Sequence, residues 1–399
     1  MGFVELITLL LSLTGFGVQA NPKAPTADQS LQYAMPDPDV VVHLDAQTIV
    51  PNNYKLLAAL PNKPEIKASP ELSQMVRQVV GQIEGARGLA KGATGIDIAT
   101  DINDATVFLQ IVPQKEPLFV ATVHGKFSTA VVDKIGKMTK GTVTKVGSGM
   151  MVETTPNDPA IGVTKDGVML AGTANLVRDR LADSWKTPPH SAGTNLGYAA
   201  DVINAHPVYA VVLTMSASAR KQVIQGVGGK NFVTDLVTRH KMGSFSVFAD
   251  GVGWSWVDSN KAGLDQMTMM SEGLLELMKA AQIAPRAIAK IALAGIDSYK
   301  GTNKQIDALI ARKADVLKLV DTYTGDGNFK VSMNKDQTKL RLDVRATGKS
   351  LSEVVSAGLF LPGVAWAMLM RSGPGKQDQM MMPEPATPAK TPALGGGRK

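Results

Sequence analysis

The first half of the chain alternates between two hydrophobic periods, one typical of strands and one typical of helices. Runs of β-branched and apolar residues predict strands at 39–46, 105–112, 117–125, 142–154 and 160–173. A hairpin signal, Lys165-Asp166-Gly167, divides the last of these runs. Apolar residues three and four positions apart predict helices at 52–60, 70–92, 127–138 and 175–185. The predicted order of elements is therefore β-α-α-β-β-α-β-β-α.

The same order begins again in the second half. A strand is predicted at 208–215, and two hairpins are predicted at 244–258 and 329–347, turning at Asp250-Gly251 and at Asn334-Lys335-Asp336. Helices are predicted at 216–227, 231–240 and 262–282, then inserted helical sequence at 285–322 and a closing helix from about Ser350. We therefore predict an α+β fold of two similar units, 36–185 and 207–358, with antiparallel sheets covered by helices. Two such units side by side would bury the sheet edges that each would expose alone.

Segments rich in Pro, Gly, Ser, Thr, Asn and Asp separate or flank these units. We expect a solvated leader at 21–35, which begins NPKAPTADQS, and a linker at 186–206, which begins KTPPHSAGTNLG. The tail from 371 to 399 is of low complexity and is predicted to be unstructured.

Residues 1–20 fit a secretory signal peptide. An apolar stretch from Leu6 to Val18 is followed by Val18-Gln19-Ala20, a small-residue cleavage site, so the mature chain would start near Asn21. The sequence departs from the usual pattern because Glu5 precedes the apolar stretch and no Lys or Arg does. Export is the favoured interpretation, and a short buried helix is the alternative.

The segment 354–370 is apolar and uncharged, and it has two interpretations. Seventeen residues lie at the lower limit of a membrane span, and Arg371 and Lys376 follow where positive charges would stay on the cytoplasmic side. The segment also starts where the second unit needs its closing helix, so part of its hydrophobicity could belong to a buried face. A membrane anchor and a core helix both remain open.

Composition narrows the classes of function. The chain is 44% hydrophobic and 19% charged, which is ordinary for a globular protein. It has no Cys, which excludes disulfides, thiolate nucleophiles and Cys-ligated metal sites. The net charge is +7, but no run of Lys and Arg occurs, so we expect no nucleic-acid partner.

No motif assigns a catalytic, cofactor-binding or metal-binding residue. The five histidines are scattered, and only His43 and His124 lie on strands that could be neighbours. Ser218 and Lys221 match the Ser-x-x-Lys pattern of penicillin-recognising enzymes, but the companion motifs are missing and a helix cap explains the serine better.

The remaining polar and aromatic clusters have structural explanations as well. Asp97, Asp101, Asp104 and Asp326 lack the pattern of a calcium loop, and turn or capping roles are favoured. The glycine-rich 226–231 follows a helix and indicates a helix end, because a phosphate-binding loop would follow a strand. Trp254 and Trp256 share one strand face and would form either a binding platform or, as we favour, part of the core.

Three motifs together resemble a loosely defined class of uncharacterised exported bacterial proteins with a duplicated α/β unit. They are the opening strand PDPDVVVHLDA, the Gly-Ile-Asp step in GIDIATDINDATVFL and the strand-to-helix step VMLAGTANLVRDRL. The resemblance covers most of 35–185 and patches of the second half. It implies export and the fold but no known reaction.

The sequence thus favours a non-enzymatic exported protein of the periplasm or cell envelope that binds or assembles, with an envelope protein or a membrane surface as the expected partner. Two alternatives remain open: a serine hydrolase acting through Ser218 and Lys221, and a cytosolic scaffold.

Overall fold

A computed structural model describes the chain over residues 25–63, 67, 70–97, 99–154, 159–227, 232–301, 307, 310–324 and 330–348. The predicted signal peptide, the segment 354–370 and the tail from 371 lie outside these residues. Among the described residues, no helix is both long enough and apolar enough to cross a membrane.

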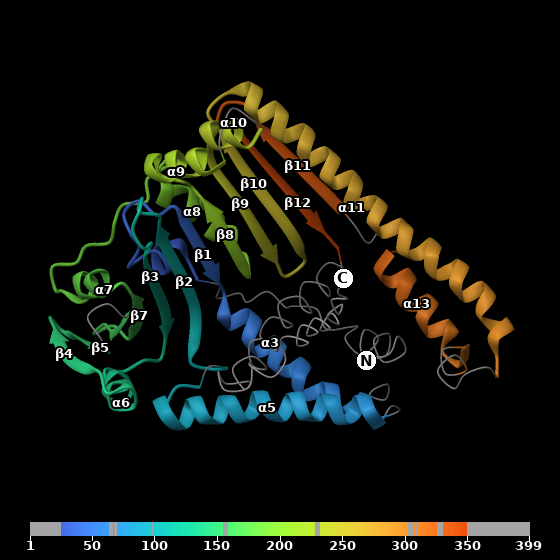
Figure 1. Cartoon of the computed structure of the whole chain (residues 1–399), viewed down its shortest axis with the longest axis horizontal. Coiled ribbons are helices and arrows are strands. Elements are labelled where there is room, and N and C mark those ends of the chain that lie inside the picture. Colours follow the sequence, from blue (N-terminus) through green and yellow to red (C-terminus); the bar gives the residue numbers. More distant parts are fainter. Residues whose placement is uncertain are drawn as a thin grey trace, which may run out of the picture.

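One antiparallel sheet of 12 strands runs through the whole molecule (Figure 1), in the order β11-β12-β10-β9-β8-β1-β2-β3-β7-β6-β5-β4. The strands of the first half are β1 (Val40–Leu44), β2 (Ile102–Gln110), β3 (Leu118–Gly125), β4 (Thr142–Val146), β5 (Gly149–Glu153), β6 (Ala160–Val163) and β7 (Val168–Gly172). Those of the second half are β8 (Tyr209–Leu213), β9 (His240–Phe248), β10 (Gly251–Asp258), β11 (Lys330–Asp336) and β12 (Arg341–Thr347). The α+β class is confirmed.

The two halves meet where β1 pairs with β8 at the middle of the sheet. The pairing is antiparallel, with Val42 opposite Val211. The two predicted sheets are therefore one sheet, because pairing their first strands satisfies backbone groups that two free edges would leave to water. Both halves place their first three strands outward from this junction, followed by their last strand. That the halves are copies of one unit remains a prediction.

One face of the sheet is covered near its middle by α2 (Ala27–Ser30) and α8 (Asn195–Ile203), and beyond β3 by α7 (Ala174–Leu181). Alternate strand residues such as Val41, Phe108 and Val212 pack there in the main core. Each such side chain contributes about 1.5–3 kcal/mol when it is removed from water.

This core corrects two of the predicted boundaries. The expected leader 21–35 enters the fold from residue 27, because Leu31 and Ala34 are fully buried. The expected linker 186–206 includes α8, whose Leu196 and Ala199 are fully buried as well. Both segments are polar in composition, but each has apolar residues spaced along one helical side, and these reach the core.

The opposite face is covered by helices of very different lengths. The first half contributes α3 (Ala46–Ala59) with its 3-10 turn Leu60–Asn62, α5 (Pro70–Thr94) and α6 (Ala130–Thr139). The second half contributes α11 (Lys261–Gly295), the 3-10 turn Ile296–Tyr299 and α13 (Lys313–Thr324), which packs against α11. Figure 1 shows α5 along one side of the molecule and α11 along another, with α11 continuing past the sheet. The pair α9 (Ala217–Val227) and α10 (Phe232–Arg239) leads into β9.

Three local predictions also need correction. The range 142–154 is a hairpin of β4 and β5, because Gly147 turns the chain with a φ of 55°. The β11–β12 hairpin turns after Asp336 rather than at 334–336, and Asp336 accepts the backbone N–H groups of Thr338 and Lys339. The helix predicted to end at 282 continues through Pro285 to Gly295.

Candidate functional site

Helix α11 lies over β10 and β12 because its apolar side packs on theirs. Asn260 caps the helix by accepting the N–H of Gly263 at 2.8 Å. Leu264 and Leu275, which lie about three turns apart on one side of the helix, are then buried against Leu342 and Val344 of β12. These contacts anchor only one side of the helix.

The other side of α11 forms a wall of a cavity of about 620 Å³, the apolar groove, whose floor is β8, β9 and β10. The lining residues carry no charge. They are Val211, Leu213, Gly243, Ser244, Phe245, Trp254, Ser255, Trp256, Met267, Met270, Ser271, Gly273, Leu274 and Leu277. The cavity is within the range of roughly 300–1,000 Å³ usual for ligand pockets.

Large apolar side chains in the groove remain exposed to solvent. Phe245 is 46% exposed and Leu213 38% exposed on the strand side. On the helix side, Met270 is 44%, Leu274 47% and Leu277 69% exposed. Because they adjoin one another across one cavity, they form a continuous apolar surface rather than isolated exposed residues, and such surfaces usually mark binding sites.

Trp254 and Trp256 project from β10 into this region, so they both line the groove and pack under α11. The indole N–H of Trp254 donates to the Ser271 hydroxyl at 3.0 Å, which ties strand to helix. Trp256 packs against His240, with 4.3 Å between ring centroids and the rings tilted by 44°, and its indole N–H has no partner within the described part of the chain. The packing under α11 agrees with the core role favoured from the sequence, and the binding platform stays a prediction.

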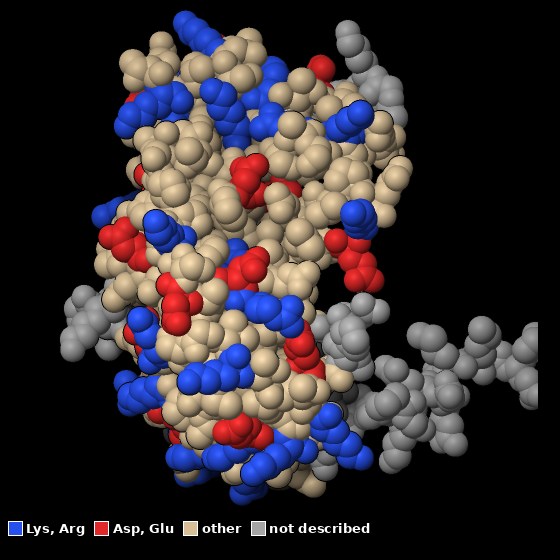
Figure 2. Space-filling view, turned by 90° about the vertical axis from the view of Figure 1, so that its left-hand side faces the viewer, with Lys and Arg blue, Asp and Glu red and all other residues tan. Residues whose placement is uncertain are grey.

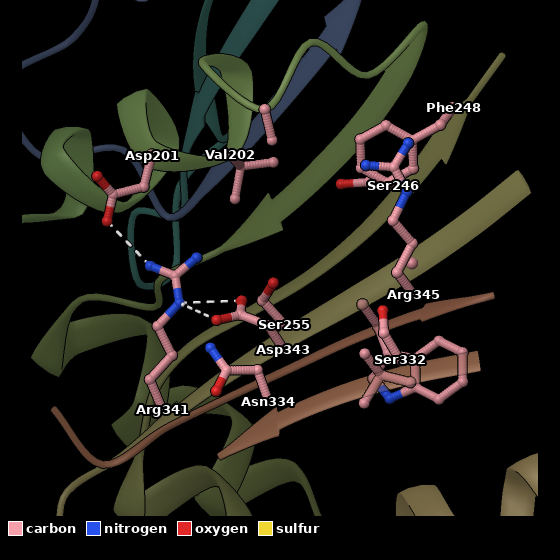
Figure 3. Close-up of a pocket in the computed structure, with 14 residues that line it drawn as sticks. Asp201, Val202, Ser246, Phe248, Ser255, Ser332, Asn334, Arg341, Asp343 and Arg345 are labelled. Carbon is pink, nitrogen blue, oxygen red and sulfur yellow. Dashed lines mark hydrogen bonds and ion pairs between the residues drawn. The ribbon is translucent and has the colours of Figure 1, made fainter. Parts of the chain in front are cut away.

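A second cavity, the polar cleft, opens on the opposite face of β9 and β10 and extends over β12 and β11 (Figure 3). Its volume is about 340 Å³, and α8 forms one wall. The side chains that project from the strands into it are mostly polar: Ser246, Ser255, Ser332, Asn334, Arg341, Asp343 and Arg345. On this same face at the other end of the sheet, apolar residues such as Leu170 are covered by α7.

Arg341 connects the strand side of the polar cleft to its helical wall. Its Nε donates to both carboxylate oxygens of Asp343, at 3.0 and 2.9 Å, and its Nη1 donates to Asp201 of α8 at 2.9 Å. Arg345, at the other end of the cleft, lies over the ring of Phe248 at 4.0 Å and donates to Asp250 at 2.8 Å.

The sequence did not indicate the groove or the cleft as sites. The signals that could have found them are the Met270, Leu274 and Leu277 spacing on one helix side and the Arg341, Asp343 and Arg345 alternation on one strand. Neither spacing alone indicates a cavity. Only the tertiary structure shows that no apolar layer among the described residues covers these side chains.

The histidines predicted to be neighbours, His43 and His124, lie on β1 and β3, with β2 between them. Both are close to Asp104 of β2. His124 Nδ1 is 2.7 Å from one carboxylate oxygen, although the ring N–H does not point along that line, and Ser30 donates to the other oxygen at 2.6 Å. His43 Nδ1 contacts the Thr106 hydroxyl at 3.0 Å.

Burial makes His43 a poor proton acceptor. It lowers the pKa of His43 to about 4, an effect that Asp104 opposes and His124 reinforces. Ser30 bonds to the aspartate and not to a histidine, so this cluster lacks the serine–histidine contact of a hydrolase. We assign it a structural role beneath α2.

The other histidines do not gather at one place. His190 pairs with Asp28 at 3.0 Å, and His206 adopts a positive φ of 56° in the turn after α8. Burial, with Arg220 nearby, lowers the pKa of His240 to about 4. Within the described residues, no group of three or more His, Cys, Asp and Glu side chains could hold a metal ion.

Ser218 and Lys221 lie in the first turn of α9, and no hydrogen bond joins the two among the described residues. The cap of this helix is Ser216 rather than Ser218, since Ser216 Oγ accepts the N–H of Ala219 at 3.2 Å. The Ser218 hydroxyl contacts that of Ser216 at 2.9 Å. Neither Ser218 nor Lys221 lines the groove or the cleft.

The aspartates of 97–104 have structural partners. Arg87 of α5 forms two bonds to Asp97, at 2.7 and 2.8 Å, and Lys91 adds a third at 3.2 Å. The Arg87 guanidinium holds the pKa of Asp97 well below its usual range. Asp101 accepts the Asp97 N–H at 2.8 Å, which fits the turn role predicted for it. Asp326 and residues 228–231 lie outside the described residues.

Charged side chains are spread over the face shown in Figure 2, where Lys and Arg are interspersed with Asp and Glu. The expected lack of a nucleic-acid partner stays a prediction.

Comparison with known proteins gives little further guidance. No protein-family model and no curated protein matches the sequence. A solved structure of TP0453, in its crystal form I, aligns with 85% of this chain and 99% of that chain, at 8% identity and a TM-score of 0.33. Such a distant likeness adds nothing to the interpretation of either cavity.

Proposed function

We propose that the protein is a non-enzymatic binding protein of the bacterial cell envelope and that its apolar groove takes the hydrocarbon chain of an amphiphile such as a fatty acid. The observation that carries the proposal is the uncharged groove between α11 and β8–β10, with partly exposed apolar side chains on both walls.

The energetics favour a long apolar occupant. Each methylene removed from water contributes about 0.8 kcal/mol, and the exposed parts of Phe245, Leu274 and Leu277 would gain from the same burial. The segment of α11 from Met267 to Leu277, eleven residues, spans about 15 Å of groove. An extended acyl chain suits this shape better than a compact polar molecule does.

The lining also favours a neutral chain over a charged group. No Lys, Arg, Asp or Glu lines the groove, so an ion placed inside would lose its hydration without gaining a partner. The polar head of the amphiphile would remain at the open end, in water. Methionines such as Met267 and Met270 suit chains of varied shape, because their side chains are flexible and polarisable.

The location of the protein is a separate part of the proposal. It rests on residues 1–20, which resemble a signal peptide. An amphiphile-binding protein would meet its ligand at a membrane surface, which agrees with a periplasmic or envelope location and with a membrane surface as partner.

The test is calorimetric titration of the full-length protein with laurate and palmitate below their micelle concentrations. We expect saturable binding of one chain per protein. Leu277→Glu should weaken it at least tenfold, because a carboxylate would enter the apolar groove. Met269→Glu is the matched control, since Met269 is 72% exposed on the same helix and does not line the groove. No saturable binding, or equal loss in both variants, would overturn the proposal.

A further inference from the structure

We infer that the polar cleft on the other face of the sheet is a second binding site, specific for a neutral, hydroxyl-rich ligand such as a sugar ring. The site is separate from the apolar groove, because α8 walls the cleft and α11 walls the groove, on opposite faces of β9 and β10.

Two polar groups at the cleft are available to a ligand. Ser246 of β9 lines the cleft, and its hydroxyl points into it in Figure 3. The Nε of Arg345 is buried and without a partner in the described part of the chain. Buried polar groups in proteins are almost always satisfied by the protein, by water or by a ligand. In Figure 3 both residues lie at the same end of the cleft.

The charges of the cleft are already matched, which argues against an ionic ligand. Arg341 is held by Asp343 and Asp201, and Arg345 by Asp250. An anion would have to approach these carboxylates, and a cation would have to approach the two guanidinium groups. Neither kind of ion would find an uncompensated opposite charge.

The uncharged lining groups match hydroxyls instead. Ser246, Ser255 and Ser332 each donate and accept, and Asn334 offers a carbonyl oxygen and an NH₂ group. A sugar ring presents hydroxyls in several directions, and each can donate to one lining group while accepting from another. The volume of about 340 Å³ lies at the small end of the usual range for ligand pockets, which suits one sugar ring.

The ionic network gives the cleft a fixed shape. Arg341 joins β12 to α8 through Asp201 and is held in place by Asp343 of its own strand, so the distance between strand and helix is set before a ligand arrives. Such pre-organisation lowers the entropic cost of binding.

The experiment is saturation-transfer NMR on the full-length protein with D-glucose, D-galactose, D-mannose and N-acetyl-D-glucosamine, each tested singly, and with inorganic phosphate as the anionic probe. We expect transfer to at least one sugar and none to phosphate. Ser246→Ala should weaken that sugar about three- to tenfold, the value of one lost hydrogen bond. It should leave the melting temperature nearly unchanged, because the hydroxyl faces the cleft.

The matched control is Ser259→Ala. Ser259 directly follows β10, is exposed, and lines neither the cleft nor the groove. Asn334→Leu is a second cleft variant and should abolish transfer. Absence of transfer to every sugar, binding of phosphate alone, or equal affinity in Ser246→Ala and the parent protein would overturn the inference. If the protein binds a sugar but not laurate, that result would overturn the proposed function and leave this inference standing.

Discussion

Acid should destabilise this protein well above the pH at which its carboxylates titrate, because two buried histidines must stay neutral in the fold. His43 is 2% exposed and His240 is 4% exposed. Burial lowers the pKa of each to about 4, from an ordinary value of 6.5. Their neighbours only modify this effect: Asp104 and His124 at His43, and Arg220 and Asp258 at His240.

The sign and size follow from proton linkage. A histidine that titrates at 6.5 in the unfolded chain and at about 4 in the fold binds protons preferentially when unfolded, so stability falls as the pH drops below 6.5. The full loss, reached below pH 4, is about 3.4 kcal/mol per histidine. By pH 5 each histidine has lost about 2 kcal/mol, or about 4 kcal/mol for the pair.

The assay is urea unfolding of the full-length protein at pH 7.5 and pH 5.0, with the free energy of unfolding extrapolated to water. His43→Gln removes one titrating group and should reduce the pH-dependent loss by about 2 kcal/mol, whatever its effect at pH 7.5. Replacing the exposed His206 by Asn, which tolerates its positive φ, is the control and should leave the loss unchanged. A parent protein equally stable at both pH values, or a His43→Gln variant with the parent's full loss, would refute the reasoning.

Three further predictions concern packing and binding. Arg180→Met should lower the free energy of unfolding by at least about 3 kcal/mol in thermal or urea melts, because the buried guanidinium donates to the carbonyls of Tyr33, Ala34 and Leu176. Arg178→Met removes an exposed ion pair and should cost under about 1 kcal/mol. Equal costs for the two variants would contradict this prediction. Leu342→Ala should cost about 2–5 kcal/mol, because Leu342 is fully buried under α11; a cost below 1 kcal/mol in the same melts would mean that α11 does not pack there. Affinity for saturated fatty acids should rise about fourfold per added methylene until the groove is full, and calorimetry showing no dependence on chain length would place the ligand elsewhere.

Much of the fold could be predicted from the sequence because it depends on local patterns. The β-branched run at Val40–Leu44 and the apolar spacing in α5 lead directly to a strand and a helix. What failed was burial in polar-looking segments. Leu31 and Leu196 belong to segments of linker-like composition, and only the assembled sheet shows that both reach one core.

The candidate sites were less predictable for a related reason. Leu277 and Met270 form one side of an amphipathic helix whether that side is packed or open, and the sequence reads the same in both cases. Arg345 likewise alternates along a strand as any solvated residue would. The groove exists because α11 lies over one face of the sheet. The cleft exists because, among the described residues, no apolar layer covers the other face there.

The most direct test of the central claim is contact quenching of tryptophan fluorescence by a brominated fatty acid. The chain has four Trp residues, so Trp185→Phe combined with Trp366→Phe leaves only Trp254 and Trp256, which both line the groove. An acyl chain bound there would bring bromine against these indoles, so we expect saturable quenching that Leu277→Glu removes and Met269→Glu retains. Quenching no greater than that by a short, water-soluble brominated acid would contradict it.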